Sequence, residues 1–471
     1  MTITTRLLIS AALCFAQSVT AQQTTVRVAS APSDTTLTGA SPEGAATVPE
    51  STVTPKKTKA PRYLIPVAEI QHLRPADQRG INVYESPKEE GVAYTGFKLG
   101  WGGAFAQQYQ NLTHQNTAAP RLVAGVNANQ LIALGQGFNN ADANLFLNVQ
   151  VARGIRIAVE TYASARHHQE TWVKDGYALI DASPIESPLL DKIMEYVTLK
   201  VGHFEVNYGD AHFRRSDNGQ TLYNPFVGNA VLDAFTTEIG AEAYLRRDGL
   251  MLMVGMTGGE VHGQVTAPGQ RAPTYLAKLG VDEQLRPDLR VRLTGSLYKT
   301  DRSVNNTLTS GDRGGSRYYD VLENTTSTET ANAWSGNIQS GMRNMVTAVV
   351  VNPFLKYTGA ELFGTVETMT GAAVTELSRR TLRQVVGEGL YRFAGEKLYV
   401  GGRYNVVQGE LAGIANDIQV TRAQVGGGWF VTPNVLSKLE LVRQTYTDFP
   451  TGDIRSGGRF QGVMLEGVVG F

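Results

Sequence analysis

The C-terminal stretch of the chain alternates between two kinds of side chain. One face would carry Val463, Leu465, Gly467, Val469 and Phe471, and the other Gly462, Met464, Glu466, Val468 and Gly470. Side chains that repeat with a period of two point to opposite faces of a β-strand. The pattern therefore predicts a final strand with one apolar face and one mixed face, ending on an aromatic residue.

The same alternation recurs between residues 93 and 471. In addition to the final strand, it predicts strands at about 97–108, 143–152, 155–160, 171–182, 194–206, 235–246, 289–298, 398–408 and 418–431. Short connections such as Arg153-Gly154 alternate with long ones at 109–142, 207–234, 262–272, 299–344, 369–378, 409–417 and 450–458. A barrel of hairpins has this order of short turns and long loops. We expect about sixteen strands, an even number that leaves both ends of the chain on the same side of the membrane.

The predicted fold class is all-β: a transmembrane, antiparallel, up-and-down β-barrel over residues 93–471. Only 42% of the residues are hydrophobic, and no apolar run after the N-terminus is long enough for a helical membrane span. The chain has 43 basic and 43 acidic residues, so its net charge does not favour nucleic acid as a partner. A soluble β-sandwich is the competing fold, but the succession of hairpins shows no Greek-key return.

The N-terminus predicts export. Met1 to Arg6 carry one positive charge, Leu7 to Val19 are largely apolar, and small residues precede a cleavage site after Ala21. We therefore expect a signal peptide at 1–21, which contains the single cysteine. Residues 22–60 are rich in Thr, Ser, Ala and Pro and predict a disordered periplasmic lead. Residues 61–92 predict an irregular segment near or inside the barrel mouth.

Three groups of residues carry a resemblance to known families. The final strand with its terminal Phe471 resembles the C-terminal signature of Gram-negative outer-membrane barrels. The motif Val201-Gly202-His203-Phe204, followed by Tyr208-Gly209, is similar to the strand-to-loop junction of porins related to the phosphate-selective type. Arg74-Pro75, Gln78 to Val83 and Trp101 to Phe105 resemble the porin-like outer-membrane β-barrel proteins of Bacteroidetes.

This resemblance implies an outer-membrane porin with periplasmic N- and C-termini that gives passive diffusion to small hydrophilic solutes. Lipid surrounds such a barrel, a homotrimer is its usual assembly, and no cofactor is needed. The resemblance also implies that loop 207–234 folds inward as a constriction, with Asp210, His212, Arg214, Arg215 and Asp217 near the narrowest point. The alternative is that these charges solvate an extracellular loop. Without a lysine-rich loop or a regular arginine ladder, phosphate specificity is not carried over.

The inward-facing strand positions give a second estimate of selectivity. Predicted wall residues of the lumen include Lys200, Arg156, Arg290, Arg292, Arg403, Arg422, Glu238 and Glu242. Basic side chains are in slight excess at such positions, so we expect a weak preference for anions. A barrel of about sixteen strands is expected to leave an aqueous lumen. The loop at 299–344 is polar and is expected to be solvated.

The sequence offers only weak candidates for metal binding or catalysis. His167 and His168 lie near Glu170, but no further ligand has the spacing of a metal site. Glu388 and Glu440 would suit an acid and base, yet no nucleophile or oxyanion-hole motif accompanies them, so we expect no catalytic residues and no enzyme. Two alternatives stay open: a barrel plugged by 61–92 and the long loops that acts in binding or scaffolding, and an outer-membrane hydrolase.

Overall fold

The computed structural model describes residues 69–85, 88, 92–166, 171–259, 269, 271–329 and 331–471. The predicted signal peptide at 1–21 and the lead at 22–60 lie outside these residues, as do His167, His168 and Glu170. Three short helical elements occur in the described part: η1 (Gln78–Gly80), α1 (Pro188–Met194) and η2 (Ala211–Phe213). No helix among the described residues is long and apolar enough to cross a membrane.

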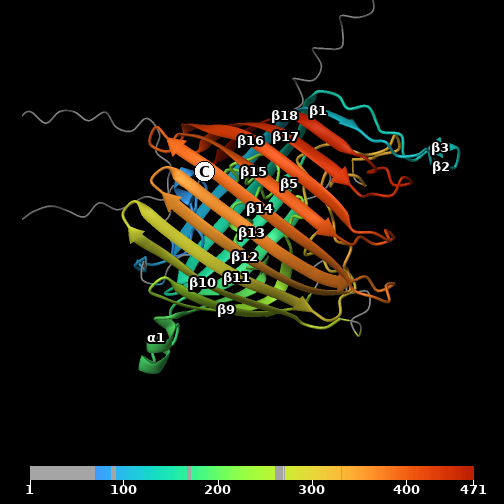
Figure 1. Cartoon of the computed structure of the whole chain (residues 1–471). Coiled ribbons are helices and arrows are strands. Elements are labelled where there is room, and N and C mark those ends of the chain that lie inside the picture. The colour runs from blue at the N-terminus through green and yellow to red at the C-terminus, as the bar shows by residue number, and fades with distance from the viewer. Residues whose placement is uncertain are drawn as a thin grey trace, which may run out of the picture. The chain divides into compact units, whose positions relative to one another are not determined.

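Sixteen strands of the described residues close into one antiparallel barrel, which confirms the predicted fold class (Figure 1). Each pairs with the next barrel strand along the chain, and the first pairs with the last. They are β1 (Lys98–Gln115), β4 (Gly137–Ala152), β5 (Ile155–Ser164), β6 (Trp172–Ile180), β7 (Val197–Glu205), β8 (Thr237–Arg247), β9 (Leu250–Thr257), β10 (Thr274–Arg286), β11 (Leu289–Thr300), β12 (Met345–Tyr357), β13 (Ala360–Ala372), β14 (Arg380–Phe393), β15 (Leu398–Gly409), β16 (Ile418–Thr432), β17 (Val435–Thr447) and β18 (Arg459–Gly470). Two further strands, β2 (Leu122–Val123) and β3 (Val126–Asn127), form a small separate hairpin.

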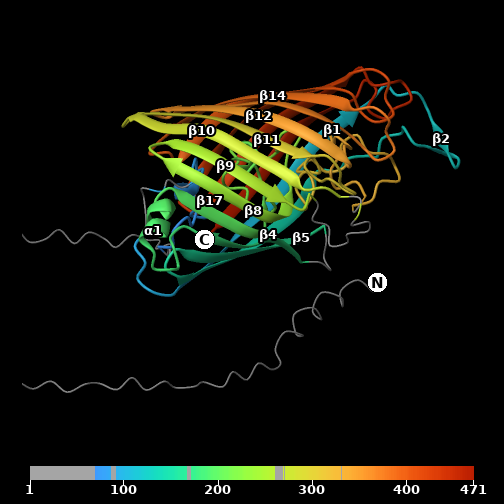
Figure 2. The ribbon, with the colours of Figure 1, turned by 90° about the horizontal axis from the view of Figure 1, so that it is seen from below.

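The two ends of the barrel differ, and we name them the turn end and the loop end. The turn end has short connections such as 153–154, 248–249 and 358–359, together with Phe471 and the longer connection that contains α1. At one turn, Asp248 and Gly249 have φ values of 47° and 73°, as a type I′ hairpin turn requires. The loop end has the long connections, and the β2–β3 hairpin projects from it, opposite α1 (Figures 1 and 2).

Several strands extend further than the alternation of apolar residues indicates. β1 continues to Gln115 and β4 begins at Gly137, so the connection predicted at 109–142 shortens to 116–136. In the added part of β1, Asn111 and Thr113 pair with Val463 and Gln461 of β18. The extended parts carry polar side chains and are held by main-chain hydrogen bonds to the neighbouring strands. The apolar alternation therefore ends before the strands do.

The two faces of the strands have opposite character. Large apolar side chains cover the outside, with Trp101 75% and Leu145 62% exposed. The inward face holds charged and polar side chains that are nearly all buried, such as Arg422 and Glu466. Leu465 and Val469 of β18 and the residue after it, Phe471, are exposed. Met464, Glu466 and Val468 of the other face are buried, which confirms the predicted faces.

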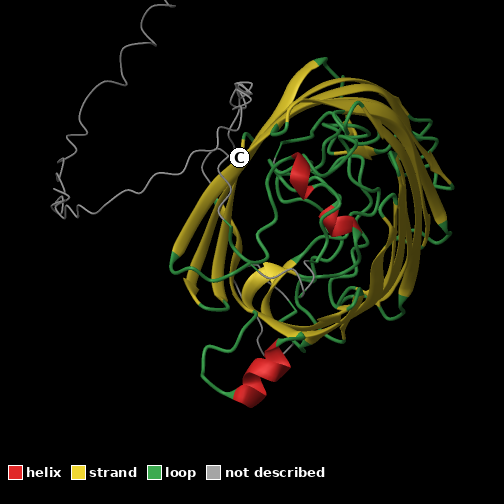
Figure 3. Ribbon diagram, turned by 90° about the vertical axis from the view of Figure 1, so that its left-hand side faces the viewer, coloured by secondary structure: helices red, strands yellow, loops and turns green. Residues whose placement is uncertain are grey.

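Chain segments fill the interior of the barrel, which corrects the expectation of an open aqueous lumen. Figure 3 shows loops and the two 3-10 turns inside the ring of strands. The segments 69–85 and 206–236 contribute to this filling, and so does much of the connection 301–344. The expectation that the last of these is solvated is wrong, because Leu308, Tyr318, Val321 and Ile338 are buried in the main apolar cluster.

Candidate functional site

The connection 206–236 crosses the inside of the barrel and is bonded to opposite parts of its wall. The backbone N–H of Gly219 donates to Asn144 Oδ1 of β4 at 2.6 Å. The N–H groups of Val231 and Leu232 donate to Asn405 of β15 and Gln384 of β14, at 2.6 and 3.0 Å. Side-chain acceptors of the wall thus satisfy backbone donors of a buried loop, which would otherwise carry a large desolvation cost.

The predicted constriction residues all lie inside the barrel, in three ion-pair groups, and Glu205 links the second group to the third through His212 and Lys174. Asp210 belongs to the first group: its carboxylate accepts from Arg292 Nε at 2.8 Å and lies 2.8 Å from Lys278 Nζ. Burial would raise the pKa of Asp210, but the charges of Lys278 and Arg292 hold that pKa below its ordinary value. This carboxylate is therefore a fixed anion against the β10–β11 wall.

The second group connects η2 to the opposite wall. Arg214 pairs with Glu388 of β14 and lies 3.5 Å from Glu361 of β13. His212 lies beside it in sequence, with Nε2 3.0 Å from Asn207 Oδ1 and Nδ1 3.5 Å from Glu205. Burial lowers the pKa of His212, which keeps its imidazole neutral near pH 7.

The third group, around Arg215 and Asp217, lies against the β5–β6 wall. Arg215 donates to both carboxylate oxygens of Asp233, at 2.9 and 2.7 Å. Asp217 accepts from Tyr162 and pairs with Lys174 of β6, and it lies 3.5 Å from Arg215 Nη1. These residues form a chain of alternating charges across part of the lumen.

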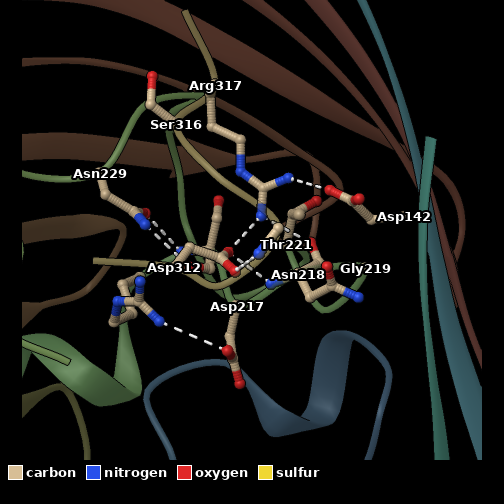
Figure 4. Close-up of polar contacts among 12 residues, drawn as sticks. Asp142, Asp217, Asn218, Gly219, Thr221, Asn229, Asp312, Ser316 and Arg317 are labelled. Atoms are coloured by element: carbon tan, nitrogen blue, oxygen red, sulfur yellow. Dashed lines mark hydrogen bonds and ion pairs between the residues drawn. The ribbon is translucent and has the colours of Figure 1, made fainter. Parts of the chain in front are cut away.

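The connection 301–344 packs onto the first loop through Arg317 (Figure 4). This guanidinium donates to Asp142 Oδ2 of β4 at 2.6 Å, and to Asp312 and the backbone O of Asn218 at 2.7 Å each. The next residue, Tyr318, donates to Glu440 Oε1 of β17 at 2.7 Å. Arg317 and Asp233 were not predicted as site residues, because nothing in the strand alternation marks a loop residue as inward-facing. Lys174 was not predicted either, although it lies on the inward face of β6.

Two cavities large enough for several water molecules approach each other from opposite ends of the barrel. The turn-end cavity has a volume of about 300 Å³ and is bordered by β1 and β4–β7, with Arg156, Lys200, Tyr177, Arg215 and Asp217 among its lining. A loop-end cavity of about 540 Å³ is lined by residues that include Phe235 and Arg313. The Arg215 guanidinium lies 4.4 Å from the centre of the Phe235 ring, so one side-chain contact separates the two cavities at this point.

The predicted wall residues all face inward, but most are bound to protein groups. Arg290 pairs with Asp282, Arg403 with Glu388, and Arg422 donates to Gln444 and to Gly336 O. Glu238 accepts from Tyr298, and Glu242 accepts from Tyr244. Only Arg156 and Lys200 of the predicted set line the turn-end cavity. Most of the wall charges therefore hold the loops in place.

The metal and acid–base candidates acquire other roles or lie outside the structure. In the described ranges, no group of three His, Cys, Asp or Glu residues has the arrangement of a metal site. Glu388 pairs with two arginines, and Glu440 accepts from the N–H of Val227 at 2.8 Å and from Tyr318. Both carboxylates thus act as structural anchors for buried loops.

Comparison with known proteins gives similarity to solved structures only: no family model and no curated protein matches the chain. OmpT, an outer membrane protein of Vibrio cholerae, has 13% identity and a TM-score of 0.46, covering 81% of this chain and 100% of that one. An anion-selective porin from Comamonas acidovorans has 11% identity and a TM-score of 0.48, with coverage of 80% and 100%. The outer membrane channel DcaP of Acinetobacter baumannii has 12% identity and a TM-score of 0.47, with coverage of 80% and 99%. These neighbours are outer-membrane proteins, but identities and scores this low assign no function to the chain.

Proposed function

We propose that this chain is an outer-membrane channel of the porin type, through which small hydrophilic solutes diffuse past a constriction formed by loop 206–236. The observation that carries the proposal is the pair of cavities that lie on either side of the Arg215–Phe235 contact inside a closed barrel. Because the remaining lumen is filled, we expect a narrow path along the β5–β8 side. The predicted constriction residues Arg215 and Asp217 border this path, whereas Asp210 and Arg214 fix the loop to the wall.

The outer surface supports a location in a lipid bilayer. Apolar side chains alternate outward on every side of the barrel, and Trp101 and Phe471 form an edge-to-face aromatic pair at the turn end, with ring centres 5.9 Å apart. A transmembrane barrel requires an apolar outer band with aromatic residues at its borders. We place the protein in the outer membrane of a Gram-negative bacterium, with both termini on the periplasmic side.

The charges of the loop-end cavity support a weak preference for anions, while the turn-end cavity, lined by as many carboxylates as cations, adds one arginine without an acidic partner among the described residues. Arg313, Arg343 and Arg455 line the loop-end cavity, against the single carboxylate of Glu323. In the turn-end cavity, Arg156 and Lys200 lie 5.7 and 4.8 Å from the Tyr177 ring. Within the described residues, Arg156 has no carboxylate at ion-pair distance, and its buried Nε has no hydrogen-bond partner. A fixed positive charge of this kind favours passing anions.

Reconstitution into a planar lipid bilayer tests the proposal. We expect small stepwise conductances, and under a salt gradient a reversal potential of the sign that anion preference gives. Purified, folded protein that inserts without any conductance steps would contradict the channel. Cation selectivity would contradict the anion preference alone.

A second candidate, a plugged barrel for binding or scaffolding, is favoured by the filled lumen. It predicts barrels that insert normally and stay closed, so the same recording separates it from the channel. The homotrimer stays a prediction, which chemical cross-linking of the protein in membranes would check. We propose no enzymatic step and no cofactor for either function.

A further inference from the structure

The segment 69–85 lies at the turn end of the barrel and is fixed to the wall there. The N–H of Gln78 donates to Pro433 O at 2.8 Å, and its side-chain amide donates to Glu396 O at 2.9 Å. Both acceptors belong to turns between strands, at β16–β17 and β14–β15. Near the start of the segment, His72 lies 3.3 Å from Asp181 in the connection before α1. The segment is therefore attached to several turns around the barrel.

The middle of the segment contacts the inward loop 206–236 directly. The Arg74 guanidinium lies 3.5 Å from the centre of the Tyr223 ring and donates to the backbone O of Phe213 at 3.0 Å. In return, the Tyr223 hydroxyl donates to Pro75 O at 2.6 Å. A Cβ on Gly80 would lie 2.1 Å from Pro75 O and 2.8 Å from the Tyr223 ring, so only glycine fits this close approach.

The end of the segment joins both the loop and the wall at two junctions. At the first junction, Asn82 accepts from Arg214 of the loop and donates to Glu361 of β13 at 2.7 Å. Between the junctions, the Tyr84 ring makes edge contacts with Phe213 of the loop and Phe354 of β12, with ring centres 5.6 Å apart in both cases.

The second junction is an ion cluster around Glu85. This carboxylate lies 2.8 Å from Lys278 Nζ of β10, pairs with Arg292 of β11, and accepts from the side-chain amide of Asn207 at 2.8 Å. Lys278 and Arg292 are also the two cations that bind Asp210 of the loop. Burial would raise the pKa of Glu85, but these two cations keep that pKa well below its ordinary value.

The negative charge of Glu85 is needed to balance the buried charges at the second junction. Lys278 and Arg292 supply two positive charges, and Asp210 and Glu85 supply the two negative ones at shortest range. Without Glu85, two buried cations would share the carboxylate of Asp210, and Arg292 would keep only its 3.1 Å contact with Asp282 in addition. An uncompensated charge in a buried cluster is costly, so water would enter and the loop would shift.

We infer that segment 69–85 is a strut that sets the position of residues 207–214, with Glu85 and Asn82 as positioning residues. The inference deepens the proposed channel function and rests on it where conductance is concerned. The strut determines how far the loop projects into the lumen, and therefore the width of the path past Arg215. The position of the loop itself is measurable whether or not the barrel conducts.

Thiol labelling tests the position of the loop. The only cysteine of the chain is Cys14, in the predicted signal peptide, so a single introduced cysteine gives a clean signal. Ala211 is half-buried and packs beside the cluster of Tyr84, Phe354 and Phe363. We expect Ala211→Cys to react with a water-soluble maleimide at least about tenfold faster when Glu85→Ala or Glu85→Gln is added, because the buried negative charge that pairs with Lys278 and Arg292 is lost. Glu85→Gln preserves the shape and removes only the charge.

The matched control is Arg79→Gln. Arg79 is in the same segment, its side chain is 52% exposed, and it pairs with Asp77 of the segment itself. We expect the Ala211→Cys labelling rate to stay at its original value with this control. An unchanged rate with both Glu85 variants, measured on barrels that keep the compact gel mobility of the folded state, would overturn the inference. If the Glu85 variants do not fold, Asn82→Ala takes their place, and an unchanged rate there overturns it equally.

Bilayer recordings separate this inference from the proposed function. Accelerated labelling with a raised single-channel conductance supports both. Accelerated labelling in barrels that never conduct supports the strut and contradicts the channel. Conducting barrels whose labelling and conductance are unaffected by Glu85→Ala and Asn82→Ala support the channel and contradict the strut.

Discussion

Arg317 and Lys174 are buried cations inside the barrel, and each is neutralised by its own set of acidic partners. Arg317 joins two carboxylates and a backbone oxygen, and Lys174 lies 3.1 Å from Glu205 and 3.6 Å from Glu160 in addition to its pairing with Asp217. The period of two along each strand predicts which wall residues face inward. It does not predict their partners, because Arg317 and Asp142 lie 175 positions apart, and their contact depends on how a loop folds.

Glu323 gives a prediction at this scale, because it is the carboxylate of the loop-end cavity. Burial raises the pKa of Glu323 to about 7, despite the hydrogen bond that it accepts from Asn332 at 2.6 Å. Below about pH 7 this group is neutral, and the cavity keeps only its three arginines. We therefore expect the anion preference to strengthen as the pH falls through 7, which the reversal potential under a salt gradient measures.

The Glu323→Gln variant is the control for this pH dependence. It should show the stronger anion preference at every pH near neutrality, since its amide does not titrate. A reversal potential that shifts equally in Glu323→Gln and in the original protein would assign the pH effect to another group.

At the scale of elements, the strands follow from the sequence and the course of the loops follows only in part. The turn at Arg153-Gly154 and the two faces of the final strand were both expected, because short turns and alternating faces are local signals. The inward course of 206–236 was expected from the resemblance, whereas that of 301–344 was missed. Its buried residues, among them Leu308 and Ile338, are spread among many polar residues without a period.

The junction of β1 and β18 leads to a prediction about Phe471. Its N–H donates to Gly103 O at 2.9 Å, Gly103 donates back at 3.0 Å, and its ring packs edge-on against Trp101. Phe471→Ala removes this ring pair. Such a pair stabilises the folded state by about 0.5–1.5 kcal/mol in addition to the contribution of the apolar area that it buries. We expect several-fold fewer folded barrels in the membrane, measured by compact gel mobility, and unchanged conductance in those that form.

Phe393→Ala serves as the comparison for Phe471. Phe393 is also an exposed aromatic at the turn end, at the close of β14, but it is remote from the β1–β18 junction. We expect near-normal assembly for this variant. If Phe471→Ala assembles as well as Phe393→Ala does, the terminal residue has no special part in barrel closure.

For the whole molecule, the filled lumen makes the connection between the two cavities the decisive feature. Phe235 is 3% exposed and separates the loop-end cavity from Arg215. Phe235→Ala would remove the ring without changing any charge, so the cavities would join along the β5–β8 side. We expect a higher single-channel conductance with little change in selectivity. Truncating a buried phenylalanine costs about 3–5 kcal/mol, so a lower unfolding temperature is expected as well.

Phe226→Ala separates the effect on the path from the effect on stability. Phe226 belongs to the same loop and is 1% exposed. The Arg403 guanidinium lies 4.5 Å from the centre of the Phe226 ring, much as the Arg215 guanidinium lies 4.4 Å from the centre of the Phe235 ring. Phe226 lines neither of the two cavities. Both variants should therefore lose similar stability, while only Phe235→Ala raises the conductance. Equal conductance in the two variants would place the permeation path elsewhere in the barrel, because Phe235 forms part of the cavity wall, whereas Phe226 packs in a buried apolar cluster outside that wall.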